Sequence, residues 1–205
     1  MAETERQLLE AIHGGERAAM RRLYDRYADY AMAVGLRYIP ERDAVRDVLQ
    51  DSFVKILTSI GQFSYRGEGS LKAWVARIVS NRAVDYLREH QRFVFVSGIP
   101  DECDEDGVAD GYPDGETVGY SDVGHGTIGH GAMPADVSPD MLMELIGRLP
   151  DNYRTVLNLF VFEERSHREI AQLLGIKEST SSSQFFRAKK LLAKNIREYL
   201  NKQGT

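Results

Sequence analysis

The sequence predicts an all-α protein of two small helical domains joined by a long, acidic, glycine-rich linker. Apolar residues recur at helical spacing before residue 93 and after residue 137, with no strand signal of any length. Between them, residues 93–147 contain no Lys or Arg and hold 10 of the 18 Gly and 4 of the 6 Pro, which interrupts periodic structure. We therefore expect domains at 1–92 and 138–205, with a linker at 93–137.

Four helices are expected in the N-terminal domain. A short helix around Thr4 to His13 ends at Gly14-Gly15, a pair that favours a helix stop. Three longer helices follow, and Pro40 separates the first two of them. Their apolar repeats are Met20, Leu23, Tyr27, Tyr30 and Val34, then Val45, Val48, Ser52, Ile56 and Ile60, then Leu71, Trp74, Ile78 and Leu87. These faces predict a helical bundle.

The C-terminal domain is expected to open with two helices. Ser138 is a good N-cap, Pro139 fits the first helical position, and Asp140 faces the positive end of the helix dipole. A second helix begins at Pro150. The apolar stripes of the two are Leu142, Leu145, Ile146 and Leu149, and then Tyr153, Val156, Leu157 and Phe160.

The segment HREIAQLLGIKESTSSSQFFRAKKLL, from His167 to Leu192, is typical of a helix-turn-helix motif. Ser166 and Glu169 fit a capping box that opens a short helix, and Gly175 stops it. A last helix runs from about Glu178 to Leu200. The shared core of the motif is expected to consist of Ile170, Leu174, Ile176, Phe185, Ala188 and Leu192, and the small Ala171 permits close approach of the helices.

In such a motif the N-terminal half of the second helix enters the major groove of DNA. Hydroxyl and amide groups hydrogen-bond base edges, and cations neutralise phosphates. The candidates for duplex contact are Ser179, Thr180, Ser182, Ser183, Gln184, Arg187 and Lys190, with Lys189 and Lys194 as further cations near phosphate. Taken alone, the motif is also compatible with an ordinary helical hairpin that has a polar, solvated face.

The net charge of −5 is divided unevenly along the chain. Residues 1–92 carry 15 basic and 13 acidic groups, residues 93–147 carry 12 acidic groups alone, and residues 148–205 carry 11 basic and 6 acidic groups. Two basic ends flank an acidic middle, so the negative total does not exclude a nucleic-acid partner.

Targeting signals and cysteine chemistry are weak in this sequence. There is no run of eighteen apolar residues and no N-terminal secretion signal, so we expect no membrane span and a cytoplasmic protein. The single Cys103 excludes an internal disulfide and a cysteine-rich zinc site. With five scattered His and no spacing of a nucleophile with a base, we expect neither an enzyme, nor a cofactor, nor a metal site.

The pattern from Asp43 to Arg92 adds a second signal. It reads DAVRDVLQDSFVKILTSIGQF, a loop containing YRGEG, and then SLKAWVARIVSNRAVDYLREHQR, and it resembles region 2 of bacterial sigma factors of the extracytoplasmic-function (ECF) group. Residues 148–197, with RLPDNYRTVLNLF before the helix-turn-helix, resemble region 4 of the same proteins. One departure is Ser181, which stands where the family commonly has a branched apolar residue.

The resemblance implies a dissociable subunit of RNA polymerase that recognises promoters and opens them. Core RNA polymerase and promoter DNA are the implied partners, and an anti-sigma factor is a further one. Region 4 would read the −35 element with the duplex-contact residues named above. The face of the third helix that would dock on the polymerase clamp helices consists of Asp47, Gln50, Asp51 and Lys55.

The resemblance also implies a −10 site around the segment FSYRGEGSLKAW, residues 63–74. In the family this loop and the following helix capture a base flipped from the non-template strand, which aromatic and amide groups can stack on and hydrogen-bond. The pocket candidates are Phe63, Ser64, Tyr65 and Asn81, with Lys72, Arg77, Arg82 and Arg88 along the neighbouring DNA. Trp74 is expected in the core, Phe63 is compatible with a core position too, and Asp85 is expected to pair with a neighbouring Arg.

Several interpretations of the acidic linker remain open. Glu102, Asp104, Asp106 and Gly107 mimic half of an EF-hand, but Pro113 stands where a bidentate Glu belongs. A metal site from Cys103, His125 and His130 has no familiar spacing. A solvated tether of 45 residues spans roughly 40 Å as a coil and at most about 150 Å when extended.

Two further interpretations give the linker an active role. In one, it threads basic channels of the polymerase until RNA displaces it. In the other, it folds onto the basic C-terminal face and suppresses DNA binding by the free subunit. For the whole chain, the alternative function is a stand-alone helix-turn-helix regulator that binds duplex DNA without polymerase. The DVLQDSF helix and the loop before Trp74 argue against that alternative.

Overall fold

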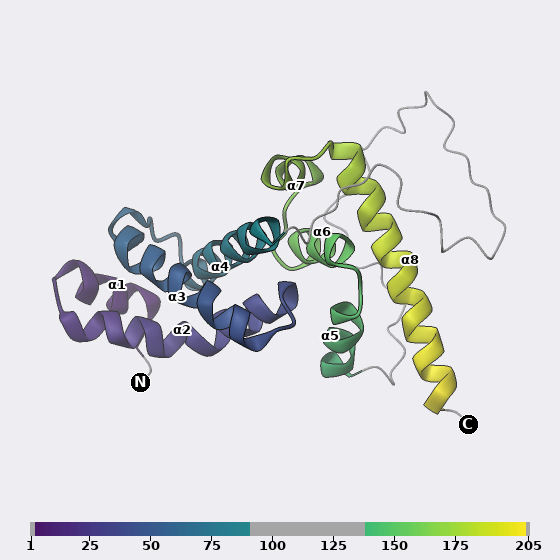
Figure 1. Cartoon of the computed structure of the whole chain (residues 1–205). Coiled ribbons are helices and arrows are strands. Elements are labelled where there is room, and N and C mark those ends of the chain that lie inside the picture. The colour runs from purple at the N-terminus through teal and green to yellow at the C-terminus, as the bar shows by residue number, and fades with distance from the viewer. Residues whose placement is uncertain (1–2, 91–137, 204–205) are drawn as a thin grey trace.

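The computed structural model describes residues 3–90 and 138–203, and every regular element in these two ranges is a helix (Figure 1). The predicted all-α class is therefore confirmed. The elements are α1 (Glu5–His13), α2 (Arg17–Tyr38), α3 (Arg42–Ser59), the 3-10 turn η1 (Ile60–Gln62), α4 (Ser70–Glu89), α5 (Pro139–Gly147), α6 (Asp151–Val161), α7 (His167–Leu174) and α8 (Glu178–Gln203).

Helix α2 is the centre of the N-terminal bundle, with α1, α3 and α4 packed against it. Of its predicted apolar repeat, Leu23, Tyr27 and Val34 are buried and Met20 and Tyr30 are half-buried. Ala31, beside Tyr30 and outside that repeat, is fully buried. The close approach of α2 and α3 depends on Gly35, where a Cβ atom would lie 2.5 Å from Cγ1 of Val45. A glycine is required there because valine is stiff at χ1 and cannot turn away.

The buried face of α4 differs from the predicted one by one residue along part of the helix. Trp74 and Ile78 are only half-buried, whereas Val75 and Val79 are fully buried beside Leu71 and Leu87. Trp74 is instead covered by Phe63, whose ring centroid lies 5.1 Å from that of the indole. The buried face of α4 is wider than the predicted stripe of Leu71, Trp74, Ile78 and Leu87, because α4 packs against both α2 and α3.

The predicted helix starts are confirmed by their hydrogen bonds. The Thr4 side chain caps α1 in a reciprocal capping box with Gln7, and Ser138 caps α5 through the amide of Met141. Ser166 caps α7 in a capping box with Glu169. Gly175 ends α7 with a left-handed φ of 70°. Helix α8 continues three residues beyond the predicted end at Leu200.

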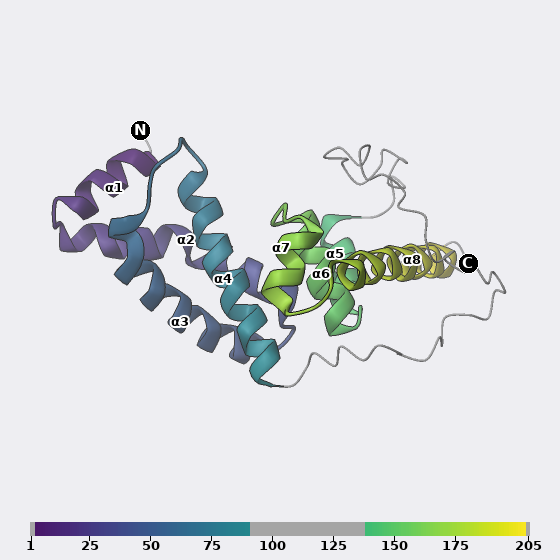
Figure 2. The same ribbon diagram turned by 90° about the horizontal axis from the view of Figure 1, so that it is seen from above.

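The C-terminal helices pack against the N-terminal bundle through α6 and α7 (Figure 2). Val156, Leu159, Ile170 and Leu174 belong to the same buried apolar cluster as the core of α1–α4. A second cluster joins α5, α6 and α8 and consists of Ile146, Leu149, Tyr153, Leu157 and Ala188. The first cluster therefore extends across both halves of the described chain, and the second lies within the C-terminal half.

The interpretations of the acidic segment lie outside the described residues. They concern the linker at 93–137 and the candidate ligands Cys103, His125 and His130. Within the described ranges, no helix has the length and apolar character needed to cross a membrane.

Candidate nucleic-acid interface

The four predicted polymerase-docking residues lie on one exposed face of α3. Asp47, Gln50, Asp51 and Lys55 are all exposed, while Val48, Ser52 and Ile56 on the opposite face are buried. Sequence analysis missed Val54, which is 63% exposed on the same face. Its spacing of three and four residues from Asp51 and Gln50 was the available signal, because an apolar side chain in an otherwise polar helix face has no core to enter.

The loop after η1 brings Phe63 and Tyr65 to one hollow of about 290 Å³. The other side of the hollow is formed by α1, with Arg6, Glu10 and His13. The Arg6 guanidinium lies 5.3 Å from the centre of the Tyr65 ring. Ser64, between the two aromatics, is exposed. No sequence signal connected α1 to this loop, because the contact joins segments more than fifty residues apart.

Asn81 is not part of this hollow. It lies seven residues beyond Trp74 on α4, which corresponds to about 10 Å of helix rise. Its Oδ1 atom accepts a hydrogen bond of 2.6 Å from Nη2 of Arg165, in the C-terminal domain. The structure therefore separates the amide candidate from the aromatic candidates.

Two further cations of the predicted −10 set also contact the C-terminal helices. The Arg88 guanidinium donates to the carbonyl oxygen of Leu173 at the end of α7. Arg77 lies 3.9 Å from the Glu169 carboxylate, and both side chains are largely exposed, so this ion pair contributes little. With Asn81, these residues form a stretch of α4 that faces α7 and the turn before it.

The remaining cations of that set have partners inside the N-terminal domain. Arg82 bridges the carboxylates of Asp51 and Glu89 at 2.9 and 3.0 Å. The Lys72 ammonium lies 4.5 Å from the centre of the Tyr30 ring. Asp85 pairs with Arg88 at 3.5 Å, as predicted.

Buried polar side chains of α6 join the two domains. Arg154 is 2% exposed and donates to the carbonyl oxygen of Tyr38, at 2.9 and 3.2 Å, and to those of Gly147 and Leu149. The amide of the fully buried Asn158 donates to the carbonyl oxygen of Arg37 at 2.6 Å. These bonds satisfy carbonyl groups at helix ends, which have no partner within their own helix.

Burial shifts the pKa values of two charged groups at the same junction. Burial raises the pKa of the Glu163 carboxyl, although the Arg37 and Arg165 guanidinium groups oppose that shift. Burial, together with the like charge of Arg77, lowers the pKa of Arg165 from its ordinary value. The physical cause is the burial of the Arg165 side chain and the partial burial of Glu163 where α4 meets the segment before α7.

The predicted −35 residues are distributed around α8 rather than on one face. Ser179, Arg187 and Lys190 are exposed, and Thr180, Ser182 and Ser183 are half-buried. Gln184 is buried on the side of the helix that carries Ser181 and Ala188, so it does not face solvent with the others. Phe186, which was missed, is 57% exposed beside Arg187.

Ser181 has a hydrogen-bonded partner at its buried position. It is fully buried, and its Oγ atom lies 3.0 Å from Nδ1 of His167. The imidazole stacks on Phe160, with ring centroids 4.6 Å apart, and contacts Phe185. Burial lowers the pKa of His167, with the nearby Glu178 carboxylate acting in the opposite direction. A polar pair thus fills the place of the apolar contact that the family pattern led us to expect.

Metal binding has no support among the residues that the structure describes. No group of three or more His, Cys, Asp or Glu side chains is placed there to hold an ion. The surfaces described above are a polar helix face, an aromatic hollow and a helix-turn-helix.

Comparison with known proteins identifies both domains. The family model for Sigma-70 region 2 matches residues 23–93, and that for Sigma-70, region 4 matches residues 140–192. The chain is 28% identical to the ECF RNA polymerase sigma-E factor of Haemophilus influenzae over 198 residues, which cover 96% of this chain and 98% of that protein. It is 26% identical to the RNA polymerase sigma-H factor of Pseudomonas aeruginosa over 97% of this chain and 96% of that protein. The ECF RNA polymerase sigma-E factor of Escherichia coli is 24% identical over 97% of both chains.

Two helical domains with a helix-turn-helix in the second, matched in this order, define a sigma factor. The chain belongs to the sigma-70 family, in its ECF group. It directs promoter-specific initiation of transcription. Sigma factors in general are not enzymes, and the family implies core RNA polymerase and promoter DNA as partners. The match to region 2 argues against the alternative of a stand-alone helix-turn-helix regulator.

Proposed function

We propose that the two domains divide promoter recognition between them. Residues 1–92 dock on core polymerase and engage the −10 element, residues 138–205 read the −35 element, and residues 93–137 connect them. The supporting observation is that the polymerase-docking candidates lie on the α3 face, the aromatic −10 candidates in the hollow between α1 and the loop at 63–69, and the −35 candidates on α8. The other −10 candidates lie along α4. The protein acts in the cytoplasm with the polymerase, and an anti-sigma factor is a further partner.

Docking is assigned to the exposed face of α3, with Val54 added to the four polar residues. An exposed apolar side chain within a charged face suits a contact with another helix, where it becomes buried and the charges set the register. Val54→Asp should abolish holoenzyme formation, and the nearly isosteric Val54→Thr should retain most of it. Equal core binding by both variants would exclude Val54 from the docking face.

Capture of a −10 base is assigned to Phe63, Ser64 and Tyr65. The half-buried rings can stack an unpaired base, and the exposed hydroxyl between them can hydrogen-bond its edge. Lys72, Arg77, Asn81, Arg82 and Arg88 are assigned to the adjacent DNA. For Asn81, Arg77 and Arg88, DNA contact requires that their bonds to the C-terminal domain be broken first.

Reading of the −35 element is assigned to the N-terminal half of α8. Ser179, Thr180, Ser182, Ser183, Arg187 and Lys190 remain the proposed contacts, and Gln184 joins them only if α8 shifts relative to its core. Arg187→Ala should weaken duplex binding by the holoenzyme and reduce the slope of log affinity against log salt by about one if Arg187 contacts phosphate. Arg197→Ala, ten residues further along the same helix, is the matched control. An equal effect of both variants would argue against a specific role of Arg187.

For the acidic linker we propose a passage through basic channels of the polymerase. Replacement of the acids at 101–116 by Asn and Gln should then weaken core binding or initial transcription at moderate salt. Unchanged activity would leave the linker as a tether.

The function as a whole is tested by run-off transcription with purified core polymerase on a pool of promoter fragments. Specific transcripts should appear only when this protein is present, and the enriched fragments supply both promoter elements. Duplex binding without any new transcript would contradict the proposed division of labour.

A further inference from the structure

Helix α4 begins without a cap from its own sequence. Its N-cap is Gly69, with a left-handed φ of 90° and no side chain to accept a hydrogen bond. The first N–H groups of a helix lack partners within the helix and need acceptors from elsewhere. Gly69 also ends the loop that carries Phe63, Ser64 and Tyr65, so whatever caps α4 also fixes the end of that loop.

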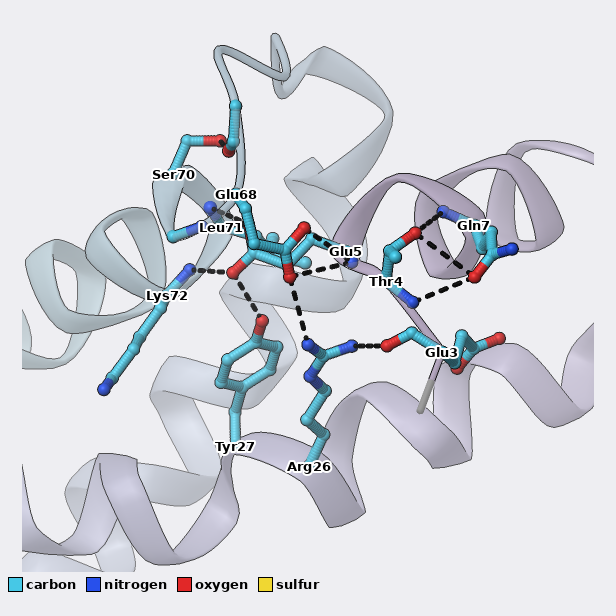
Figure 3. A network of polar contacts seen from close by, with 12 residues as sticks. Glu3, Thr4, Glu5, Gln7, Arg26, Tyr27, Glu68, Ser70, Leu71 and Lys72 are labelled. Carbon is cyan, nitrogen blue, oxygen red and sulfur yellow. Dashed lines mark hydrogen bonds and ion pairs between the residues drawn. The ribbon is translucent and has the colours of Figure 1, made fainter. Parts of the chain in front are cut away.

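The missing acceptor is Glu5, from the first turn of α1 (Figure 3). One carboxylate oxygen accepts from the amides of Gly69 and Leu71, each at 3.0 Å. The other accepts from the amide of Lys72 at 3.1 Å and from the Tyr27 hydroxyl at 2.8 Å. Glu5 is 2% exposed. A carboxylate with four donors at the positive end of a helix is a strong, desolvated anchor.

A second set of bonds ties the loop itself to α1 and α2. The Glu68 carboxylate accepts from the backbone amide of Glu5, at 3.3 Å to each oxygen, and from Arg26 at 3.4 Å. It also accepts from the Tyr65 hydroxyl at 3.3 Å. Glu5 therefore binds the loop and the helix start through both its side chain and its backbone (Figure 3). The next residue, Arg6, lies over the ring of Tyr65.

We infer that Glu5 is a positioning residue for −10 recognition. It holds the loop at 63–69 and the start of α4 in the geometry that presents Phe63 and Tyr65 to an unpaired base, without touching the base itself. This inference rests on the proposed capture of a base by that loop. It gives α1 a role in promoter opening that is exerted through one carboxylate.

The test uses holoenzyme and single-stranded oligonucleotides that carry the −10 element of a promoter found by run-off transcription. The ratio of the dissociation constants for an abasic and an intact oligonucleotide is measured at each position. This ratio is large only where a base is captured, and a variant that merely unfolds part of the population leaves it unchanged. Glu5→Gln keeps the size of the side chain but loses its charge and half of its acceptor capacity.

We expect Glu5→Gln to lower the ratio roughly tenfold at the captured base, the equivalent of one lost hydrogen bond to a charged group. Tyr27→Phe, which removes one of the four donors, should lower it less and covers the case in which Glu5→Gln does not fold. Asp29→Asn, an exposed carboxylate on α2, is the control and should not change the ratio.

Different results would contradict the positioning role of Glu5 and the capture of a base by the loop at 63–69. If Phe63→Ala lowers the ratio but neither Glu5→Gln nor Tyr27→Phe does, Glu5 serves folding alone and the inference is wrong. If no position shows a raised ratio in the unaltered protein, or if Phe63→Ala leaves it unchanged, the proposed capture of a base by the loop is wrong, and the role of Glu5 falls with it.

Discussion

Two charged side chains are buried at the ends of helices to which they do not belong, and they are opposite in sign. Glu5 accepts hydrogen bonds from the amides at the start of α4. Arg154 donates to the carbonyl oxygens of Tyr38 and Gly147, the last residues of α2 and α5. The start of a helix has free N–H groups and a partial positive charge, and its end has free C=O groups and a partial negative charge. Each ion lies where the backbone complements it.

The two sites differ in what they join. Glu5 links α1 to α4 inside one domain, whereas Arg154 links α6 to α2 across the two domains. Neither site depends mainly on an oppositely charged side chain, although Arg154 also pairs with Asp151. At both sites, backbone groups at helix ends offset the free-energy cost of burying a charge. That role is usually attributed to salt bridges.

The largest effect is expected at Arg154. Arg154→Met keeps the length of the side chain but leaves the carbonyls of Tyr38, Gly147 and Leu149 without donors, and should reduce the free energy of unfolding by about 3 to 5 kcal/mol. Thermal and urea unfolding of the full chain, followed by circular dichroism, measures it. Arg148→Met is the matched control, since Arg148 is exposed and its ion pair within residues 3–90 and 138–203 is the exposed one with Glu144. A similar loss in both variants would contradict the role given to Arg154.

A smaller loss is expected at Glu5. Glu5→Gln retains part of the acceptor capacity and the volume, so the free energy of unfolding should fall by about 2 kcal/mol, through weakened bonds to buried donors. Asp29→Asn should change it by less than about 0.5 kcal/mol, as is usual for an exposed site. If Glu5→Gln were as stable as the control, water would have to replace the carboxylate at the start of α4.

Asn158 tests whether the charge matters or only the donor. Its amide donates to the carbonyl oxygen of Arg37, and its own Oδ1 atom has no hydrogen-bond partner among the described residues. Asn158→Ala should therefore cost about 1 kcal/mol, the usual net value of one neutral hydrogen bond. The same unfolding measurements apply. A cost equal to that of Arg154→Met would mean that packing at the domain junction, rather than the guanidinium, dominates.

Local signals in the sequence predicted most of the fold, and the long-range contacts escaped prediction. The helix starts at Thr4, Ser138 and Ser166 were predictable because a cap and its partner lie three residues apart. Glu5 and Arg154 gave no such signal. The α4 amides that Glu5 accepts from lie at least 64 residues away, and its remaining donor Tyr27 lies 22 residues away. The Tyr38 carbonyl that Arg154 binds across the domains lies 116 residues away. Distance along the sequence also explains which parts of the candidate site were predicted. The aromatics of the loop were found, but the contribution of α1 to their hollow and the contact of Asn81 with Arg165 were not.

His167 provides the smallest and most specific test, because this half-buried residue at the first position of α7 has the uncharged Ser181 hydroxyl as its polar contact. Burial lowers its pKa, so the unfolded chain binds a proton more readily than the folded one as pH falls below about 6.5. The contribution of the neutral His167 imidazole to the free energy of unfolding is complete above that pH. It is lost as the pH falls through the lower pKa that His167 has in the folded protein. Between pH 7 and 5, the free energy of unfolding should therefore fall more in the unaltered protein than in His167→Gln, which does not titrate. His13→Gln, at an exposed histidine of α1, is the matched control for replacing an imidazole by an amide. If His167→Gln showed the same pH dependence as the unaltered protein, burial at this position would not disfavour the charged imidazole.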